Sequence, residues 1–251
     1  MNLVIDIGNT FVKAALFAEN SLSDCVHCRC GESETLQTFL KDVNPDACAV
    51  SCVAGEMPKI DCWLKKLTCP VLRVTGATPL PFRNAYRTPQ TLGSDRIAAV
   101  AGAQILCPGK DVLVADIGTC LTLDVIDAGG TFLGGNISPG PSMRFFALHE
   151  GTARLPLIEQ KGDSPLVGYN TETAIRSGVL RGIALEIEGY AQMLRREKPE
   201  LVLMVTGGKG ASIQTFLDPN TPVVYEPHLV EIGLNAILNH NLNTSSALKA
   251  D

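Results

Sequence analysis

The chain has 251 residues, of which 45% are hydrophobic and 19% charged, and its formal net charge is −5 at pH 7. This composition is typical of a globular protein with a substantial core and excludes disordered and fibrous classes. The acidic balance gives no electrostatic reason to bind nucleic acid or an anionic membrane, which normally require a clustered basic surface, so we expect neither as a partner.

The beginning of the chain and its cysteines indicate a cytoplasmic protein. Met1-Asn2-Leu3-Val4-Ile5-Asp6 has no basic leader and carries an early acidic residue, unlike a secretory signal. The longest mainly apolar stretch, 97–106, is about half as long as a membrane-spanning helix. The odd number of cysteines, nine, favours reduced thiols. Cys25-x-x-Cys28-x-Cys30 has no second pair at the spacing of a zinc module, so an alternating strand is favoured there over a metal site.

Strands and helices are predicted to alternate along the first half of the chain. An apolar run, a glycine turn and a second apolar run predict a β-hairpin at its start. Ser94 can cap a helix that follows a proline-containing loop. The predicted order is a hairpin over 3–18, a helix at 34–43, a strand at 46–53, a helix at 57–67, a strand at 70–74, a loop at 75–92 and a helix that opens at Ser94.

The second half repeats this order of hairpin first and helices later. Its predicted elements are strands at 111–117, 120–127 and 130–137, helices at 141–150 and 171–198, a strand at 201–205 and a final helix at 227–241. Pro227 suits the first turn of that last helix. Hairpins followed by alternating helices and strands predict α/β layers in each half.

An internal repeat divides the chain. Leu3-Val4-Ile5-Asp6-Ile7-Gly8-Asn9-Thr10 recurs 110 residues later as Leu113-Val114-Ala115-Asp116-Ile117-Gly118-Thr119-Cys120. The linker chemistry of Cys107-Pro108-Gly109-Lys110 lies between the copies. We therefore expect two similar domains, residues 1–109 and 110–251.

The first copy of the repeat has the residue types that a phosphate site needs. Its glycine turn, two short polar side chains and the nearby ammonium of Lys13 can approach and neutralise phosphates. Asp6, at a strand end, can hold Mg²⁺ through water, because Mg²⁺ prefers oxygen ligands. A single copy could equally be a hairpin turn without a ligand, but two copies favour a two-sided phosphate clamp.

Other nucleotide-binding patterns are absent from the sequence. Gly208-Lys209 has no glycine five residues before it, and no strand-GxGxxG-helix unit occurs, which argues against P-loop and Rossmann proteins. Gly207 and Gly208 follow a predicted strand, where a base or ribose could lie against the backbone. A simple strand-to-helix turn explains this glycine pair as well.

Gly93-Ser94-Asp95-Arg96 places a carboxylate and a guanidinium at a helix start. The positive end of the helix favours an ionised Asp95, which could then accept a proton. Helix capping is the competing explanation for this motif.

The motifs together resemble type III pantothenate kinases, of the acetate and sugar kinase, Hsp70 and actin superfamily. The resemblance spans about residues 2–240, and the only departure noted is Cys120, where alanine is more usual. The matching motifs are Asp6-x-Gly8-Asn9-Thr10 with Lys13, Tyr86-x-x-Pro89-x-x-x-Gly93-x-Asp95-Arg96, Asp116-x-Gly118-Thr119-x-x-Thr122-x-Asp124, Gly134-Gly135-x-Ile137-x-Pro139-Gly140, Ala153-x-Leu155-Pro156, Asn170-Thr171 with Ser177-Gly178, and Thr206-Gly207-Gly208.

The resemblance implies an α/β fold of two similar actin-like ATPase (ribonuclease H-like) halves with a nucleotide cleft between them. It implies that Asp6 to Lys13 contact ATP phosphates and Mg²⁺, that Thr119 binds ATP from the other half, and that Asp116 helps to hold K⁺ or ammonium. It assigns pantothenate binding to Tyr86, Gly93, Ser94, Asp95, Arg96 and Thr171, with Asp95 as the base.

The expected reaction is phosphorylation of pantothenate by ATP, the first step of coenzyme A biosynthesis. A kinase of the same superfamily with another acceptor and a non-catalytic nucleotide-binding regulator are the alternatives. We also expect a homodimer around the helix at 171–198. Ile175, Gly178, Val179, Gly182 and Ile183 broaden its apolar face, although a helix inside the chain's own core would explain the same pattern.

Overall fold

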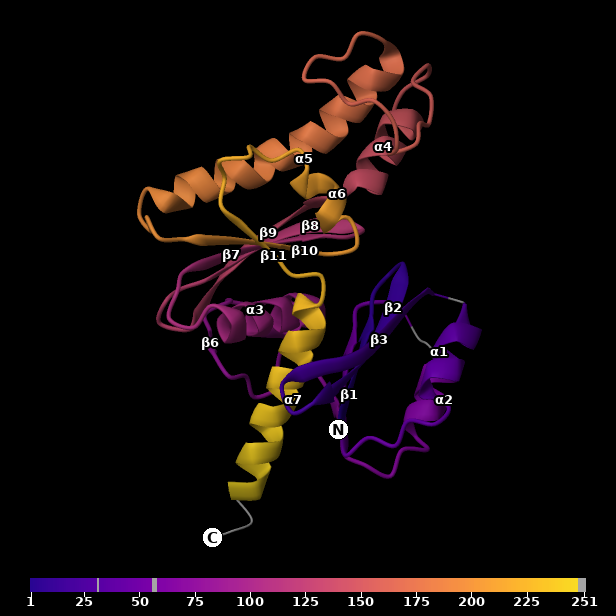
Figure 1. Ribbon diagram of the computed structural model, residues 1–251, viewed down its shortest axis with the longest axis vertical. Helices are drawn as coiled ribbons and strands as arrows, with labels where there is room; N and C mark the ends of the chain where they lie inside the picture. The colour runs from indigo at the N-terminus through magenta and orange to yellow at the C-terminus, as the bar shows by residue number, and fades with distance from the viewer. Residues whose placement is uncertain (31, 56–57, 248–251) are drawn as a thin grey trace. The chain divides into compact units, whose positions relative to one another are not determined.

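The computed structural model describes residues 1–30, 32–55 and 58–247. The chain forms two compact units (Figure 1). The first contains Met1–Pro108, Gly130–Leu133 and Leu229–Asp251, and the second contains Gly109–Gly129 and Gly134–His228. The first unit thus takes two later segments of the chain, and the domain boundary expected between 109 and 110 stays a prediction.

A five-stranded mixed sheet forms the centre of the first unit, in the order β3-β2-β1-β4-β5. Its strands are β1 (Asn2–Ile7), β2 (Phe11–Ala18), β3 (Ser21–Arg29), β4 (Ala47–Cys52) and β5 (Val71–Arg73). β1 pairs antiparallel with β2 and parallel with β4. The hairpin predicted from the apolar runs around Gly8 is therefore confirmed, and the three cysteines after residue 24 lie on or beside β3, as their alternation indicates.

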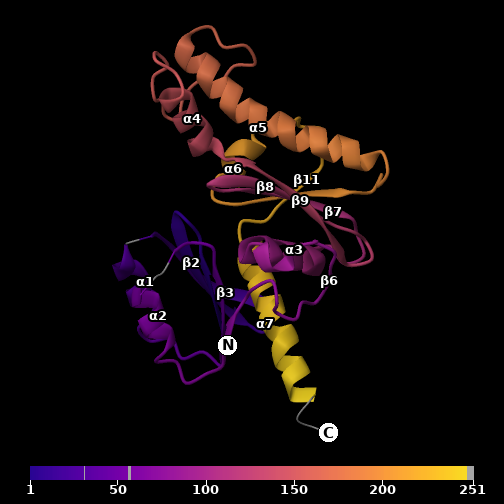
Figure 2. The same cartoon turned by 180° about the vertical axis from the view of Figure 1, so that it is seen from behind.

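Helices cover both faces of this sheet. α1 (Ser33–Leu40) and α2 (Pro58–Leu64) lie on one face (Figure 2). Their leucines pack against Leu3 and Ile5. α3 (Ser94–Leu106) and α7 (Leu229–Ala247) pack against each other and against β4. Since side chains alternate along a strand, the residues of β1 that point away from the α1–α2 core face the second pair of helices.

Several predicted boundaries differ from the structure. Gly93, and not Ser94, is the N-cap of α3, and no side chain caps that end. Pro227 precedes the final helix, which begins at Leu229. The loop predicted at 75–92 contains the short strand β6 (Arg83–Asn84) and the 3₁₀ helix η1 (Pro89–Thr91). Residue 57, the predicted start of the second helix, lies outside the described residues.

The second unit is built on another mixed sheet, with β11, β10, β7, β8 and β9 as successive neighbours. The strands are β7 (Val112–Ile117), β8 (Cys120–Ile126), β9 (Thr131–Pro139), β10 (Val202–Thr206) and β11 (Val223–Tyr225). β7 and β8 form the second predicted hairpin, which is thereby confirmed. The first residues of β9, Thr131 and Phe132, belong to the first unit, where they pair with β6.

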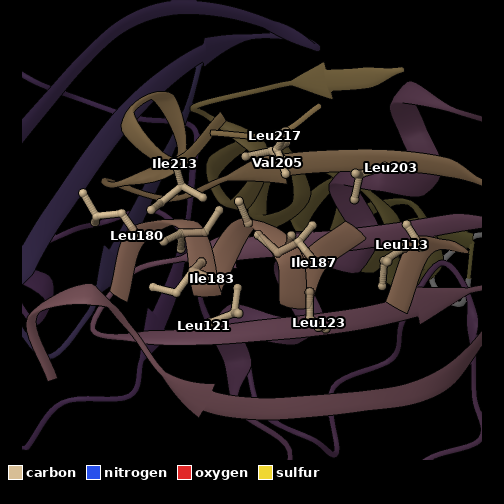
Figure 3. Packing of buried hydrophobic residues seen from close by; sticks show 14 of the residues in the cluster. Leu113, Leu121, Leu123, Leu180, Ile183, Ile187, Leu203, Val205, Ile213 and Leu217 are labelled. Atoms are coloured by element: carbon tan, nitrogen blue, oxygen red, sulfur yellow. The ribbon is translucent and has the colours of Figure 1, made fainter. Parts of the chain in front are cut away.

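One face of this sheet carries the core of the second unit. Figure 3 shows Ile183 and Ile187 of α5 (Thr171–Arg195) against Leu121 and Leu123 of β8. α6 (Gly210–Gln214) adds Ile213, and α4 (Pro141–Glu150) packs against α5.

This packing corrects the argument made for a dimer. The apolar face of α5 that was expected to meet a second subunit points inward: Ile175, Val179 and Ile183 are buried in the unit's own core.

Among the described residues, no helix combines the length and the apolar character that crossing a membrane requires.

Candidate functional site

Three polar side chains meet at the end of β1. In the pairing registers, Asp6 lies opposite Lys13 of β2 and opposite Ser51 of β4. Cross-strand partners project on the same face of a sheet. Asp6, Lys13 and Ser51 therefore share the face that α3 and α7 cover, and we call them, with the residues these two helices add, the first strand-end cluster.

The first turns of α3 and α7 complete this cluster. Glu231 of α7 is only 1% exposed, and its Oε1 lies 3.1 Å from Lys13 Nζ. Ser94 of α3 is buried, with its hydroxyl 2.9 Å from that of Ser51, and it accepts a hydrogen bond from Cys52 N at 3.2 Å. The Ser94 side chain thus fastens the start of α3 to β4 instead of capping the helix.

The carboxyl group of Asp6 is buried and has a raised pKa. Its side chain is 9% exposed, and burial, followed by the negative charge of Glu231, raises its pKa from 3.8 to about 7. Lys13 and a hydrogen bond from Ser51 act in the opposite direction. Among the described residues, Asp6 Oδ1 and Glu231 Oε2 are buried without a hydrogen-bond partner. Unpaired carboxylate oxygens of this kind fit a hydrated Mg²⁺, which prefers oxygen ligands.

Asp95 lies in the first turn of α3, next to this cluster. Burial raises the pKa of its carboxyl group, while the N–H and guanidinium of Arg96 lower it. Arg96 N donates to Asp95 Oδ1 at 2.8 Å. The carboxylate turns back toward position 93, where a Cβ would lie 2.5 Å from Asp95 Oδ1. A half-buried carboxylate with a raised pKa is a better proton acceptor than an exposed one.

The hairpin turn beside Asp6 exposes short polar residues. Gly8 N donates to Phe11 O at 3.0 Å, and Asn9 and Thr10 are exposed at the tip. Cys30, the residue after β3, bonds to both sides of the turn: its N donates to Thr10 O at 2.9 Å and its Sγ to Gly8 O at 3.2 Å. Ile7 is buried in the core, so only its backbone is available to a phosphate.

An aromatic stack supports Arg96, which is buried. Its Cζ lies 5.6 Å from the centre of the Tyr86 ring, a cation–π geometry. The Tyr86 ring in turn stacks on the Phe132 ring, with 6.0 Å between centroids and 21° between planes. Phe132 in turn meets Phe82 edge to face. The structure therefore brings together Tyr86 and Arg96, two residues that the sequence motif separates by ten positions.

A second strand-end cluster lies in the second unit. Asp116 of β7 is opposite Thr122 of β8 and Thr206 of β10. Gly207 follows Thr206 with φ +89°, and a Cβ there would collide with Asp116 Oδ1. Thr206 Oγ1 is buried without a partner in the described part of the chain. A half-buried carboxylate with a neighbouring unpaired hydroxyl oxygen fits a monovalent cation.

A hydrogen bond from the N-terminal end of α4 fixes the second hairpin turn. Gly118 N donates to Cys120 O at 2.9 Å, and Gly140, at the start of α4, donates its N–H to Thr119 O at 3.0 Å. The Thr119 side chain stays exposed. Gly208 is exposed beyond the turn, with open space where a Cβ would stand.

The expected site residues fall into two groups. Asp6 to Lys13, Tyr86 and Gly93 to Arg96 lie in the first unit, and Asp116, Thr119, Gly207, Gly208 and Thr171 lie in the second. Thr171 is the exposed first residue of α5, behind an Asn170 capping box. No group of three or more His, Cys, Asp or Glu side chains with metal-binding geometry occurs in the described ranges.

Comparison with known proteins decides the family. A family model described as type III pantothenate kinase matches residues 2–193. Type III pantothenate kinase of Bacteroides fragilis is 44% identical over 241 residues, 96% of this chain and 98% of that protein. The one of Phocaeicola vulgatus is 42% identical and covers 96% of this chain and 99% of its own. The chain belongs to the type III pantothenate kinase family.

Several solved structures share the fold of this chain, although their sequences are only distantly similar to it. A conserved protein of the Baf family of transcriptional activators from Campylobacter jejuni superposes with a TM-score of 0.62 at 22% identity, over 96% of this chain and 99% of that one. The activator of 2-hydroxyisocaproyl-CoA dehydratase from Clostridium difficile, with bound ADPNP, gives 0.58 at 13%, over 100% and 97%. A ROK family glucokinase from Streptomyces griseus gives 0.50 at 14%, over 95% and 98%. The predicted actin-like α/β fold class is confirmed.

The family motifs do not contain two residues of the clusters, Ser51 and Glu231, and they contain Thr206 without assigning it a role. Ser51 and Thr206 each end an apolar strand run, beside Asp6 and Asp116 respectively. A hydroxyl residue after a buried strand was the available signal. Glu231 could be found only as an acidic residue in a helix's first turn, which is usually a helix-dipole feature.

Proposed function

We propose that this chain transfers the γ-phosphoryl group of ATP to the primary hydroxyl group of pantothenate, giving 4′-phosphopantothenate and ADP, in the first step of coenzyme A biosynthesis. The observation that carries the proposal is Asp95, a half-buried carboxylate beside the first strand-end cluster, in a chain of the type III pantothenate kinase family. Because a protein that only binds nucleotide needs no base at this place, Asp95 favours catalysis over a purely regulatory role.

Asp95 acts as the base in this proposal. Its raised pKa makes the carboxylate a better proton acceptor than an exposed aspartate, so it can take the proton of the hydroxyl group as that oxygen attacks. Arg96 and Tyr86 bind the acceptor. The guanidinium is held by the Tyr86 ring and presents several donors to an acceptor rich in oxygen.

ATP phosphates are assigned to both hairpin turns. The turn from Gly8 to Thr10 and the ammonium of Lys13 would bind phosphates in the first unit, and Thr119 would bind ATP in the second. Glu231 keeps the Lys13 ammonium beside Asp6. Asp6 would hold Mg²⁺ through water, and the ion would neutralise phosphate charge when bound. The base or ribose would lie on the backbone of Gly207 and Gly208.

Asp116 would help to hold K⁺ or ammonium. Asp116 lies opposite Thr206 in the strand register, so the two side chains share a face of the sheet. Such an ion supplies positive charge where the second unit has no counterpart to Lys13, since Thr122 takes that place opposite Asp116.

The active form is proposed to be a cytoplasmic homodimer. In the segment before α5, the side chains of Leu166, Val167 and Tyr169 are 70–79% exposed. Neighbouring apolar residues with this exposure indicate an interaction surface, unlike apolar residues scattered singly. The same segment is fixed from α5, because Arg176 donates to Glu159 O and Asp163 O. An ordered apolar surface beside Thr171 suits a second copy that completes the acceptor site. Sedimentation of fully active protein at micromolar concentration should give a dimer mass, and a monomer mass would contradict this.

A product assay tests the function. The protein is incubated with Mg-ATP, K⁺ and a panel of vitamins and small hydroxy acids, and phosphorylated products are identified by mass. We expect 4′-phosphopantothenate. Another phosphorylated acceptor would indicate a different kinase of the superfamily, and nucleotide binding without any product would indicate a regulator.

A further inference from the structure

Four buried side-chain atoms lack a hydrogen-bond partner among the described residues: Asp6 Oδ1, Glu231 Oε2, Thr206 Oγ1 and Asn84 Nδ2. Buried polar atoms are normally paired, so each unpaired one needs a reason. The first three belong to the two strand-end clusters, where nucleotide and ions are assigned. Asn84 lies outside both clusters, and its unpaired atom is a donor, not an acceptor.

Asn84 stands at the edge of the acceptor region. It ends β6 and pairs with Phe132 of β9, the residue on which the Tyr86 ring stacks. Partners in a strand register project to the same face of the sheet, so Asn84 and Phe132 share a face. Asn84 therefore lies on the side of the stack formed by Phe132 and Tyr86, which supports Arg96.

The orientation of the Asn84 amide is determined by its neighbour. Its Oδ1 accepts a hydrogen bond from Tyr86 N at 2.9 Å. Since a backbone N–H can only donate, the oxygen must be the end that faces it, and exchange of the two amide ends is excluded. Nδ2 is consequently the end left over, a donor with a fixed position.

We propose that Asn84 is a specificity-determining residue of the acceptor site, whose Nδ2 donates a hydrogen bond to a carbonyl or carboxylate oxygen of bound pantothenate. This inference rests on the proposed function and names a contact that the kinase motifs do not contain. A buried donor selects strongly, because an acceptor molecule without an oxygen at that place leaves the donor unpaired. The bond to Tyr86 N preorganises the amide, so little side-chain entropy is lost on binding.

Two substitutions separate this role from a structural one. Asn84→Asp keeps the oxygen that holds Tyr86 N and replaces only the donor. Asn84→Leu has a similar size and removes both, without adding charge. If Asn84 only supports Tyr86, the Asp variant should behave as the wild type and the Leu variant should not. If Asn84 donates to pantothenate, both variants should raise KM for pantothenate by roughly tenfold, the value of one such hydrogen bond, with KM for ATP changed less than about twofold.

The matched control is Asn241→Asp. Asn241 Nδ2 already donates to Pro79 O and Ile237 O, so its hydrogen bonds are made within the chain. The control therefore makes the same asparagine-to-aspartate change in the first unit at an amide nitrogen that has partners. It should leave both KM values unchanged. Melting temperatures show which variants fold. If the Asn84→Leu variant does not fold, the KM values of the Asn84→Asp variant decide between the two roles.

The outcomes divide cleanly. An Asn84→Asp enzyme with the wild-type KM for pantothenate, or a parallel rise in KM for ATP, would overturn the assignment of Asn84 and leave the proposed function intact. A wild-type protein that neither phosphorylates nor calorimetrically binds pantothenate would overturn the proposed function, and the assignment with it.

Discussion

The two strand-end clusters have the same skeleton and different chemistry. In each, an aspartate is the next-to-last residue of the first strand of a hairpin and has a hydroxyl residue beside it on a parallel strand: Ser51 next to Asp6, and Thr206 next to Asp116. The residue opposite on the hairpin differs, because Lys13 stands in the first unit where Thr122 stands in the second. The first turn is also longer by one residue, since Ile7 pairs with Val12 but Ile117 pairs with Leu121.

What covers each cluster explains the different properties of the aspartates. The first turns of α3 and α7 cover Asp6 and place Asp95 and Glu231 near it. The Asp6 carboxyl group is therefore buried among charged side chains. A glycine turn covers Asp116 and leaves it half-buried. The same local motif is therefore buried among charged side chains in one unit and half-buried beneath a glycine turn in the other.

The largest effect is expected at Asp95, which has no counterpart in the second cluster. Asp95→Asn keeps the shape of the side chain but removes the proton acceptor. Turnover with pantothenate should fall by roughly 10²–10⁴-fold, the usual contribution of a positioned base, with KM for ATP retained. Asp61→Asn, in the first turn of α2, is the control. Near-normal kcat in a folded Asp95→Asn protein would return the motif to a structural role.

The burial of Asp6 should appear in the pH dependence of stability. Its carboxyl group binds a proton more tightly in the folded chain, with a pKa of about 7, than at its ordinary value of 3.8. The free energy of unfolding without ligands should therefore fall as the pH rises from about 4 to about 7, by about 4 kcal/mol at most. Asp6→Asn should flatten this part of the curve in urea titrations. An unchanged curve would mean that Asp6 is not the group responsible.

The second cluster should be sensitive to its covering turn. Gly207→Ala forces a side chain into a positive-φ position and against Asp116, so the second unit should lose about 1–3 kcal/mol of stability. Gly118→Ala is the matched comparison, because a Cβ there would lie 3.7 Å from Cys120 O, an ordinary contact. Chemical denaturation measures both. Equal losses would show that the close approach of Gly207 to Asp116 is unimportant.

Ion dependence should belong to the second cluster alone. Replacing K⁺ by Na⁺ or by a bulky organic cation at constant ionic strength should lower turnover severalfold. Asp116→Asn should reduce activity and remove the difference between the ions. Equal rates of the wild type in all three salts would contradict a cation at Asp116.

Much of the site was predictable because its parts are local. Apolar runs around Asp-Ile-Gly specify each hairpin within about fifteen residues, and the structure confirms both. The capping role given to Ser94 was wrong for the opposite reason. Its hydroxyl bonds to Ser51, which is 43 residues away, and no local pattern announces that partner.

The sequence by itself determined the two hairpins, the order of strands and helices, and the short motifs that the family shares, since each depends on residues within a few positions. Only the tertiary structure decided which face of α5 is buried and which residues complete each cluster. α7 comes from the end of the chain, yet it packs in the first unit and brings Glu231 to Lys13. That arrangement depends on burial of apolar surface between distant segments, which is non-directional and leaves no spacing in the sequence to read.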